Sequence, residues 1–173
     1  GERASRHAGS SGRRAIEHRG PDAEGLWTDG KVVFAHSRLS ILDLSADANQ
    51  PFFQNEQQVI TYNGEIFNFE ELRRELVTDF QFKTSSDTEV LYRLLEKWGR
   101  QGLRRLNGMF AFGYYDRTQK KLLLVRDRFG IKPLYFFHDH RGLIFSSEQK
   151  AIYPLSSRRP TVSLLGGLSS PKN

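Results

Sequence analysis

The chain has 173 residues, of which 38% are hydrophobic and 12% aromatic, so it can bury one core but is too short for two full domains. No run of about 20 apolar residues and no signal-like start is present, which predicts a cytoplasmic protein with no membrane partner. The chain contains no cysteine, which excludes disulfides, cysteine-ligated metal sites and thiol catalysis by these residues.

The formal charge of +6 is concentrated near the two ends. Residues 1–20 hold five Arg against two Glu, and residues 156–173 hold three basic residues and no acidic one. The 18 remaining basic residues are matched by 18 acidic ones, so the central part is neutral. A nucleic-acid-binding domain would concentrate Lys and Arg on a folded face, and we therefore expect no nucleic-acid partner.

Composition divides the chain into three parts. Residues 1–14 are rich in Gly, Ser and Arg without a periodic apolar pattern, which predicts a disordered basic segment. Residues 15–155 form the predicted domain, and residues 156–173 form an irregular tail.

Within the domain, runs at 31–36, 38–42 and 58–62 are rich in β-branched and large apolar residues and predict strands. Two helices follow. Asn68 with Glu71 predicts a capping box that opens the first helix, and Ser86 with Glu89 repeats the pattern for a second helix that ends at Gly99.

From residue 109 the runs MFAFGYYD, KLLLVRD, LYFFHD and LIFSSE are separated by turn residues, which predicts one meander of antiparallel strands. Because these runs are almost continuously apolar, we expect both faces of that sheet to be covered. The elements together indicate a layered α+β domain with two stacked sheets.

Short polar segments that contain glycine lie at the ends of the predicted strands, where a rigid scaffold can direct side chains toward a ligand. They are HRGPD at 18–22, HSRLSILD at 36–43, YNGEIFN at 62–68, SSDTE at 85–89, GMFAF at 108–112, RDRFGIKPLYF at 126–136 and FSSE at 145–148. In this order, over roughly residues 15–152, they resemble the glutaminase domain of glutamine-hydrolysing asparagine synthetases, a class II glutamine amidotransferase.

The resemblance implies a four-layer αββα sandwich of two stacked, mainly antiparallel sheets of the N-terminal nucleophile hydrolase type, here expected without its first strand. In the family, an N-terminal cysteine attacks the side-chain amide of glutamine, and ammonia passes to a synthetase domain fused downstream. That synthetase domain holds the ATP and Mg, so we expect no cofactor and no metal here. Because this chain begins with Gly1, we expect glutamine binding without ammonia release.

The resemblance places the oxyanion hole at Asn63 and Gly64. A side-chain amide and the backbone N–H of a residue without a Cβ can both approach one oxygen closely. The alternative is an ordinary Asn-Gly hairpin turn.

The resemblance places glutamine recognition at Arg38, with backbone groups of Leu39 and Ile41, and at Asp87, with Glu65 of lower rank. An arginine fork matches a carboxylate. A carboxylate in the first turn of a helix is kept ionised by the macrodipole and can accept an ammonium. The alternatives are a surface arginine and an ordinary helix-start aspartate.

The other matching residues are expected to frame the site. They are His18 to Asp22, His36, Arg126 to Pro133 and Glu148. Three hypotheses follow: an asparagine synthetase glutaminase domain without its nucleophile, a glutamine-binding pseudoenzyme or regulatory domain, and a nucleic-acid-associated protein with basic arms.

Overall fold

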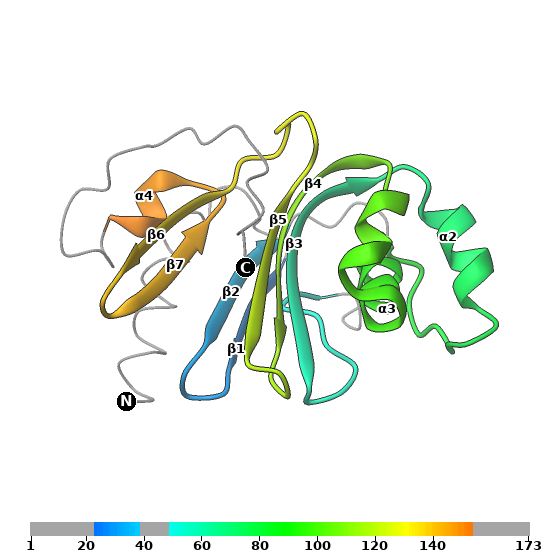
Figure 1. Cartoon of the computed structure of the whole chain (residues 1–173), viewed down its shortest axis with the longest axis horizontal. Helices are drawn as coiled ribbons and strands as arrows, with labels where there is room; N and C mark the ends of the chain where they lie inside the picture. Colours follow the sequence, from blue (N-terminus) through cyan, green and yellow to red (C-terminus); the bar gives the residue numbers. More distant parts are fainter. Residues whose placement is uncertain (1–22, 39–48, 154–173) are drawn as a thin grey trace, which may run out of the picture.

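The computed structural model describes residues 23–38 and 49–153, which form an α+β arrangement (Figure 1). In chain order its elements are β1 (Ala23–Thr28), β2 (Val33–Arg38), β3 (Gln58–Ile66), α2 (Phe69–Leu76), α3 (Asp87–Trp98), the 3-10 helix η3 (Gly99–Arg105), β4 (Gly108–Asp116), β5 (Lys121–Arg126), β6 (Tyr135–Asp139), β7 (Gly142–Ser146) and α4 (Gln149–Ile152). The predicted segments 1–14 and 156–173 and the missing first strand concern residues outside this part.

All described strand pairs are antiparallel and group into three sheets. β1 and β2 form a hairpin, β3, β4 and β5 form a three-stranded sheet with β4 in the centre, and β6 and β7 form a second hairpin. The prediction of a single meander from residue 109 is therefore wrong. The apolar runs were located correctly, but the segment between β5 and β6 leaves the ladder and divides the four strands between two sheets.

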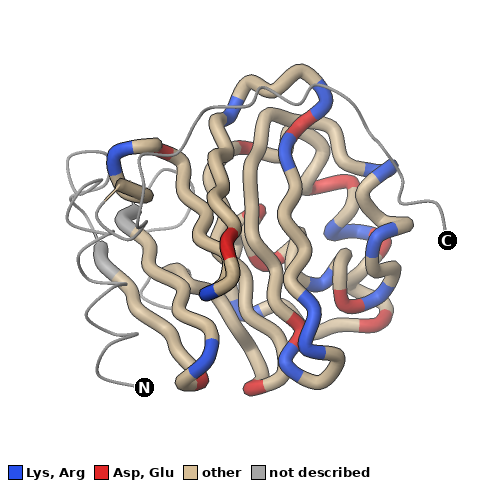
Figure 2. Tube along the Cα trace, turned by 60° about the vertical axis from the view of Figure 1, so that its left-hand side comes forward, with Lys and Arg blue, Asp and Glu red and all other residues tan. Residues whose placement is uncertain are grey.

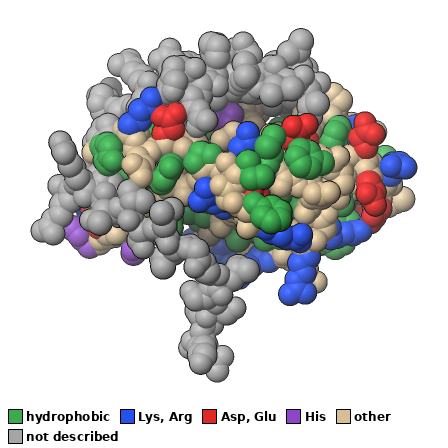
Figure 3. Space-filling model, turned by 90° about the horizontal axis from the view of Figure 1, so that it is seen from above, with side chains coloured by type: hydrophobic (Ala, Val, Ile, Leu, Met, Phe, Trp, Pro, Cys, Tyr) green, Lys and Arg blue, Asp and Glu red, His purple; other side chains and the backbone are tan. Residues whose placement is uncertain are grey.

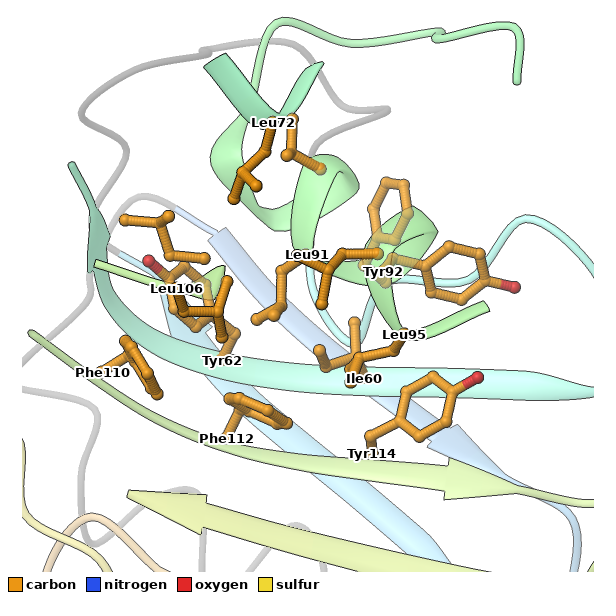
Figure 4. Close-up of a cluster of buried hydrophobic side chains, with 14 of the residues drawn as sticks. Ile60, Tyr62, Leu72, Leu91, Tyr92, Leu95, Leu106, Phe110, Phe112 and Tyr114 are labelled. Carbon is orange, nitrogen blue, oxygen red and sulfur yellow. The ribbon is translucent and has the colours of Figure 1, made fainter. Parts of the chain in front are cut away.

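The main core lies between the three-stranded sheet and the helices α2 and α3 (Figures 1 and 4). Along β3, Ile60, Tyr62 and Ile66 face the helices because side chains alternate along a strand. They meet the apolar stripe of α3, including Leu91 and Leu95, which recurs at helical spacing.

A second cluster packs the three-stranded sheet against the hairpins. Its buried members are Phe34 of β2, Val59 of β3 and Tyr115 of β4, and Phe145 of β7 packs at its margin. With α4 against β6 and β7, the layers run from α2 and α3 through two layers of strands to α4 (Figure 1). Both faces of β4 are thus covered as predicted, whereas β5, β6 and β7 remain half-exposed.

The two predicted helix caps differ in outcome. Ser86 accepts a hydrogen bond from Glu89 N at 3.3 Å and caps α3 as predicted, but the Glu89 carboxylate accepts from Lys83 N and Thr84 N and does not complete the capping box. The side chain of Asn68 makes no cap at α2. It instead accepts from Asn107 N at 3.0 Å and donates to Arg105 O at 3.0 Å. The predicted capping box of α2 is therefore wrong, because the Asn68 side chain binds residues far along the chain instead.

Strand boundaries near the beginning of the described part also differ from the prediction. The strand expected at 31–36 runs from Val33 to Arg38, and the strand expected at 38–42 lies mostly outside the described residues. β1 has no counterpart in the sequence analysis, because AEGLWT lacks a regular apolar alternation. Among the described helices, none has the length and apolar character needed to cross a membrane.

Candidate functional site

Among the described residues, no named strand pairs with the edge of β3 that faces away from β4. This open edge receives hydrogen-bond acceptors from outside its sheet. In an antiparallel ladder the N–H groups of alternate residues point to opposite edges. Three of them are bound here, from Ile60 to Phe52 O at 2.9 Å, from Tyr62 to Gln50 Oε1 at 2.6 Å and from Ile66 to Asp87 Oδ2 at 3.1 Å. The even-numbered residues of β3 therefore direct their N–H groups at this edge.

Gly64 belongs to the same alternation. Its ladder partner Phe110 does not use its backbone to bind Gly64, because Phe110 N donates to Asp127 Oδ2 at 3.2 Å and Phe110 O accepts from Asp127 N at 2.7 Å. The Gly64 N–H is thus directed at the open edge, between the positions held by Gln50 and Asp87. A backbone donor that points out of its sheet is the kind of group from which an oxyanion hole can be built.

A glycine is needed at position 64 for steric reasons as well. Its φ is 153°, which L side chains rarely adopt, and an added Cβ would lie 2.2 Å from Met109 O and 2.6 Å from Phe110 Cα. Both contacted atoms belong to the backbone of β4, so no side-chain movement can relieve the clash. β3 and β4 approach this closely only because position 64 has no Cβ.

Asp87 is the first residue of α3 and reaches the same edge. Its Oδ2 accepts from the Tyr62 hydroxyl at 2.6 Å and from Ile66 N at 3.1 Å. The residue is only 6% exposed. α3 therefore places a carboxylate beside the end of β3 that carries Asn63, Gly64 and Glu65.

Burial raises the pKa of the Asp87 carboxyl, a result that the helix macrodipole argument did not anticipate. Hydrogen bonds from Tyr62, Ile66 N and Thr88 N oppose the rise, and the charge of Glu65 adds to it. The helix start is therefore not the only influence on the ionisation of Asp87. The balance is set by burial against the donors that surround the carboxyl.

The other predicted binding residues are described to different extents. Asn63 is half-buried, and by alternation it lies on the face of β3 opposite to Tyr62, which is the face toward β2. Glu65 is exposed. Arg38 is the last residue of β2, but its side chain, like Leu39 and Ile41, lies outside the described part.

The structure describes some of the residues that were expected to frame the site. His36 Nδ1 lies 3.0 Å from Thr61 Oγ1, and this contact joins β2 to β3. Glu148 precedes α4 and pairs with Lys150 at 3.0 Å. The segment from His18 to Asp22 is outside the described part.

Asp127 organises the loop between β5 and β6, a role that sequence analysis did not assign. Its buried carboxylate accepts from the backbone N–H groups of Phe110, Phe129, Ile131 and Lys132 at 3.0 to 3.2 Å. Burial alone would raise its pKa, but these donors together hold the pKa below the ordinary value. The aspartate between two arginines in RDRFGIKP was visible in the sequence, but nothing in the sequence marked it as buried.

The loop that Asp127 holds presents apolar side chains to solvent. Phe129 is 87% exposed and Ile131 57%. Figure 3 looks down on the molecule from above and shows hydrophobic side chains beside Lys and Arg side chains on that face. On the helical side, basic and acidic residues are interspersed (Figure 2), with ion pairs such as Arg105 with Glu75 and Lys97 with Asp79.

A family model for a glutamine amidotransferase domain matches residues 2–165. The chain belongs to the glutamine amidotransferase domain family. The match spans the open edge of β3, Asp87 and the loop held by Asp127, so all three features belong to one family domain.

Full-length relatives give the family context. The chain is 41% identical over 143 residues to asparagine synthetase B (glutamine-hydrolysing) of Escherichia coli, an alignment that covers 82% of this chain and 26% of the relative. It is 44% identical over 140 residues to asparagine synthetase (glutamine-hydrolysing) 2 of Bacillus subtilis, covering 80% and 18%. The aligned region is thus only 26% and 18% of the length of these two relatives.

The fold is shared with a solved amidotransferase. Glutamine phosphoribosylpyrophosphate amidotransferase from B. subtilis superposes with a TM-score of 0.71 at 24% identity, covering 85% of this chain and 40% of that chain. This likeness supports the predicted α+β fold with stacked antiparallel sheets.

Proposed function

We propose that this domain binds free glutamine at the open edge of β3 and is the glutaminase part of an asparagine synthetase. The observation that carries the proposal is the juxtaposition of the outward Gly64 N–H with the Asp87 carboxylate, which is fixed to Ile66 N of the same strand at 3.1 Å. The identities of about 40% with glutamine-hydrolysing asparagine synthetases support the assignment.

Each residue has a defined task in this proposal. Gly64 N–H and the Asn63 side-chain amide stabilise the oxygen of the glutamine side chain as it becomes negative, which typically contributes a factor of about 10² to 10³ in rate for one donor. The Asp87 carboxylate binds the α-ammonium, with Glu65 nearby. Arg38 binds the α-carboxylate together with backbone groups of Leu39 and Ile41.

The domain is expected to deliver ammonia to a synthetase domain in the same polypeptide. The region shared with this chain is 26% and 18% of the length of the two relatives, which leaves room for such a domain. We propose no cofactor for the residues of this domain. ATP and Mg are assigned to the synthetase part.

Glutamine binding is the direct test. Calorimetric or NMR titration of the chain with L-glutamine should give saturable binding in the millimolar range. Arg38→Ala and Asp87→Asn should each reduce the affinity at least tenfold, because each removes a charged partner of the ligand. Arg100→Ala and Asp79→Asn alter exposed residues elsewhere and serve as matched controls. Glutamine binding unchanged by the first pair would contradict the assignment.

Glutamine binding without turnover is the second candidate function, because these 173 residues include no cysteine. We expect no ammonia when this chain is incubated with glutamine, while binding persists. Appreciable ammonia release, measured with a coupled dehydrogenase assay, would exclude this candidate.

A further inference from the structure

Tyr62 connects β3 to the start of α3 through the residue that is proposed to bind the substrate ammonium. Its ring belongs to the main core between β3 and the helices (Figure 4), and its hydroxyl donates to Asp87 Oδ2 at 2.6 Å. The residue is 4% exposed, so the hydrogen bond is shielded from water. In such surroundings a hydrogen bond to a carboxylate is stronger than in solvent.

The Tyr62 hydroxyl and the Ile66 N–H both donate to the same oxygen of Asp87, Oδ2, at 2.6 and 3.1 Å. Two donors on one oxygen fix the rotation of the carboxylate about its side-chain bonds. They also stabilise the ionised form in a place where burial favours the neutral acid. An ammonium is bound well only by the ionised form.

We propose that Tyr62 is a positioning residue for glutamine recognition: it holds Oδ2 of Asp87 so that Oδ1 is presented, as part of a carboxylate, to the α-ammonium of the substrate. The inference rests on the proposed function and deepens it. It names the group that makes a buried aspartate competent to bind a cation. Glycine at 64 and the cap at Ser86 then place β3 and α3 so that this contact forms.

Tyr62 remains a hydrogen-bond donor at every relevant pH. Burial, followed by the charge and hydrogen bond of Asp87, raises the pKa of its hydroxyl far above the ordinary value. In the described part of the chain, the charged or titratable groups that act on Asp87 are Tyr62 and Glu65, both of β3. Removal of the Tyr62 hydroxyl takes away the largest influence that lowers the pKa of Asp87, so that only the Ile66 and Thr88 N–H groups oppose burial and Glu65.

The test compares two ligands that differ only in the ammonium. L-glutamine and glutaramate, which lacks the α-amino group, are titrated into the wild-type chain, Tyr62→Phe and Tyr114→Phe between pH 5 and 9. Tyr114 is a matched control because it is also a buried core tyrosine of the same sheet. Tyr62→Phe should weaken glutamine binding about tenfold and leave glutaramate binding unchanged. The pH at which glutamine binding is half lost should also move upward.

The outcomes separate this inference from the proposed function. Failure of the wild-type chain to bind glutamine refutes both. Wild-type binding that is lost in Asp87→Asn but equal in Tyr62→Phe and Tyr114→Phe, with the same acid midpoint, refutes the role of Tyr62 alone. Equal weakening of both ligands in Tyr62→Phe indicates only a structural effect and also refutes it.

A spectroscopic measurement covers the case in which Tyr62→Phe does not fold. The side-chain carboxyl carbon signal of Asp87 is followed by NMR in the wild-type chain as pH is varied, with and without glutamine. Binding of an ammonium should lower the pKa of Asp87. An Asp87 titration that glutamine does not shift would overturn the proposal.

Discussion

Substitution of Gly64 by alanine tests whether the close approach of β3 and β4 depends on the missing Cβ. The new Cβ would lie 2.2 Å from Met109 O, and real Cβ contacts are essentially never under 3.0 Å, so the backbones must separate by about 0.8 Å. Overpacking of this kind costs about 1–3 kcal/mol. The φ of 153° adds about 1–3 kcal/mol of backbone strain.

Gly99→Ala is the matched control for this substitution. Gly99 has a φ of 53°, but an added Cβ would meet nothing within 4 Å. Gly99→Ala should therefore lower the free energy of unfolding only by the backbone strain, about 1–3 kcal/mol. Urea unfolding followed by circular dichroism gives both free energies of unfolding. Gly64→Ala should cost about 1–3 kcal/mol more than Gly99→Ala, and equal costs would refute the steric argument.

Two further substitutions test the buried polar groups. Asp127→Asn should cost about 2–3 kcal/mol at pH 7, because a charged acceptor of four backbone N–H groups is lost. The folded-state pKa of Asp127 lies below its ordinary value of 3.8, so this stabilisation is present above about pH 4 and is lost as pH falls through the folded pKa. Urea unfolding at pH 7 and pH 2.5 should therefore show the wild type and variant converging in acid, and a constant difference would contradict the charge argument. Ser86→Ala should cost about 1 kcal/mol by removing the cap of α3, and an unchanged urea midpoint would show that the hydrogen bond to Glu89 N contributes nothing.

The elements that the sequence predicted well are those whose signals are local. The stripe from Val90 to Trp98, with Ser86 before it and Gly99 after it, contains the start, buried face and end of α3. The apolar run of β4 likewise predicted a strand covered on both faces. Such patterns need only the periodicity of one segment.

Predictions were less successful where contacts outside the segment decided the outcome. The side chain of Asn68 was expected to cap α2 but binds the backbone of residues 105 and 107. The four apolar runs after residue 109 were expected in one sheet, but the loop tied to Asp127 separates them. At Asn68, tertiary hydrogen bonds thus replaced the local cap that the sequence favoured.

For the site, the sequence by itself determined which residue types are present and that YNGEI and SSDTE follow the amidotransferase pattern. Only the tertiary structure decided that the Gly64 N–H points away from β4 and that Asp87 is buried beneath Tyr62. These properties arise from contacts between residues 17 to 25 positions apart. The orientation of an N–H group depends on strand pairing, and the ionisation of a carboxyl depends on burial and its donors, so neither can be obtained from the spacing of residues in one segment.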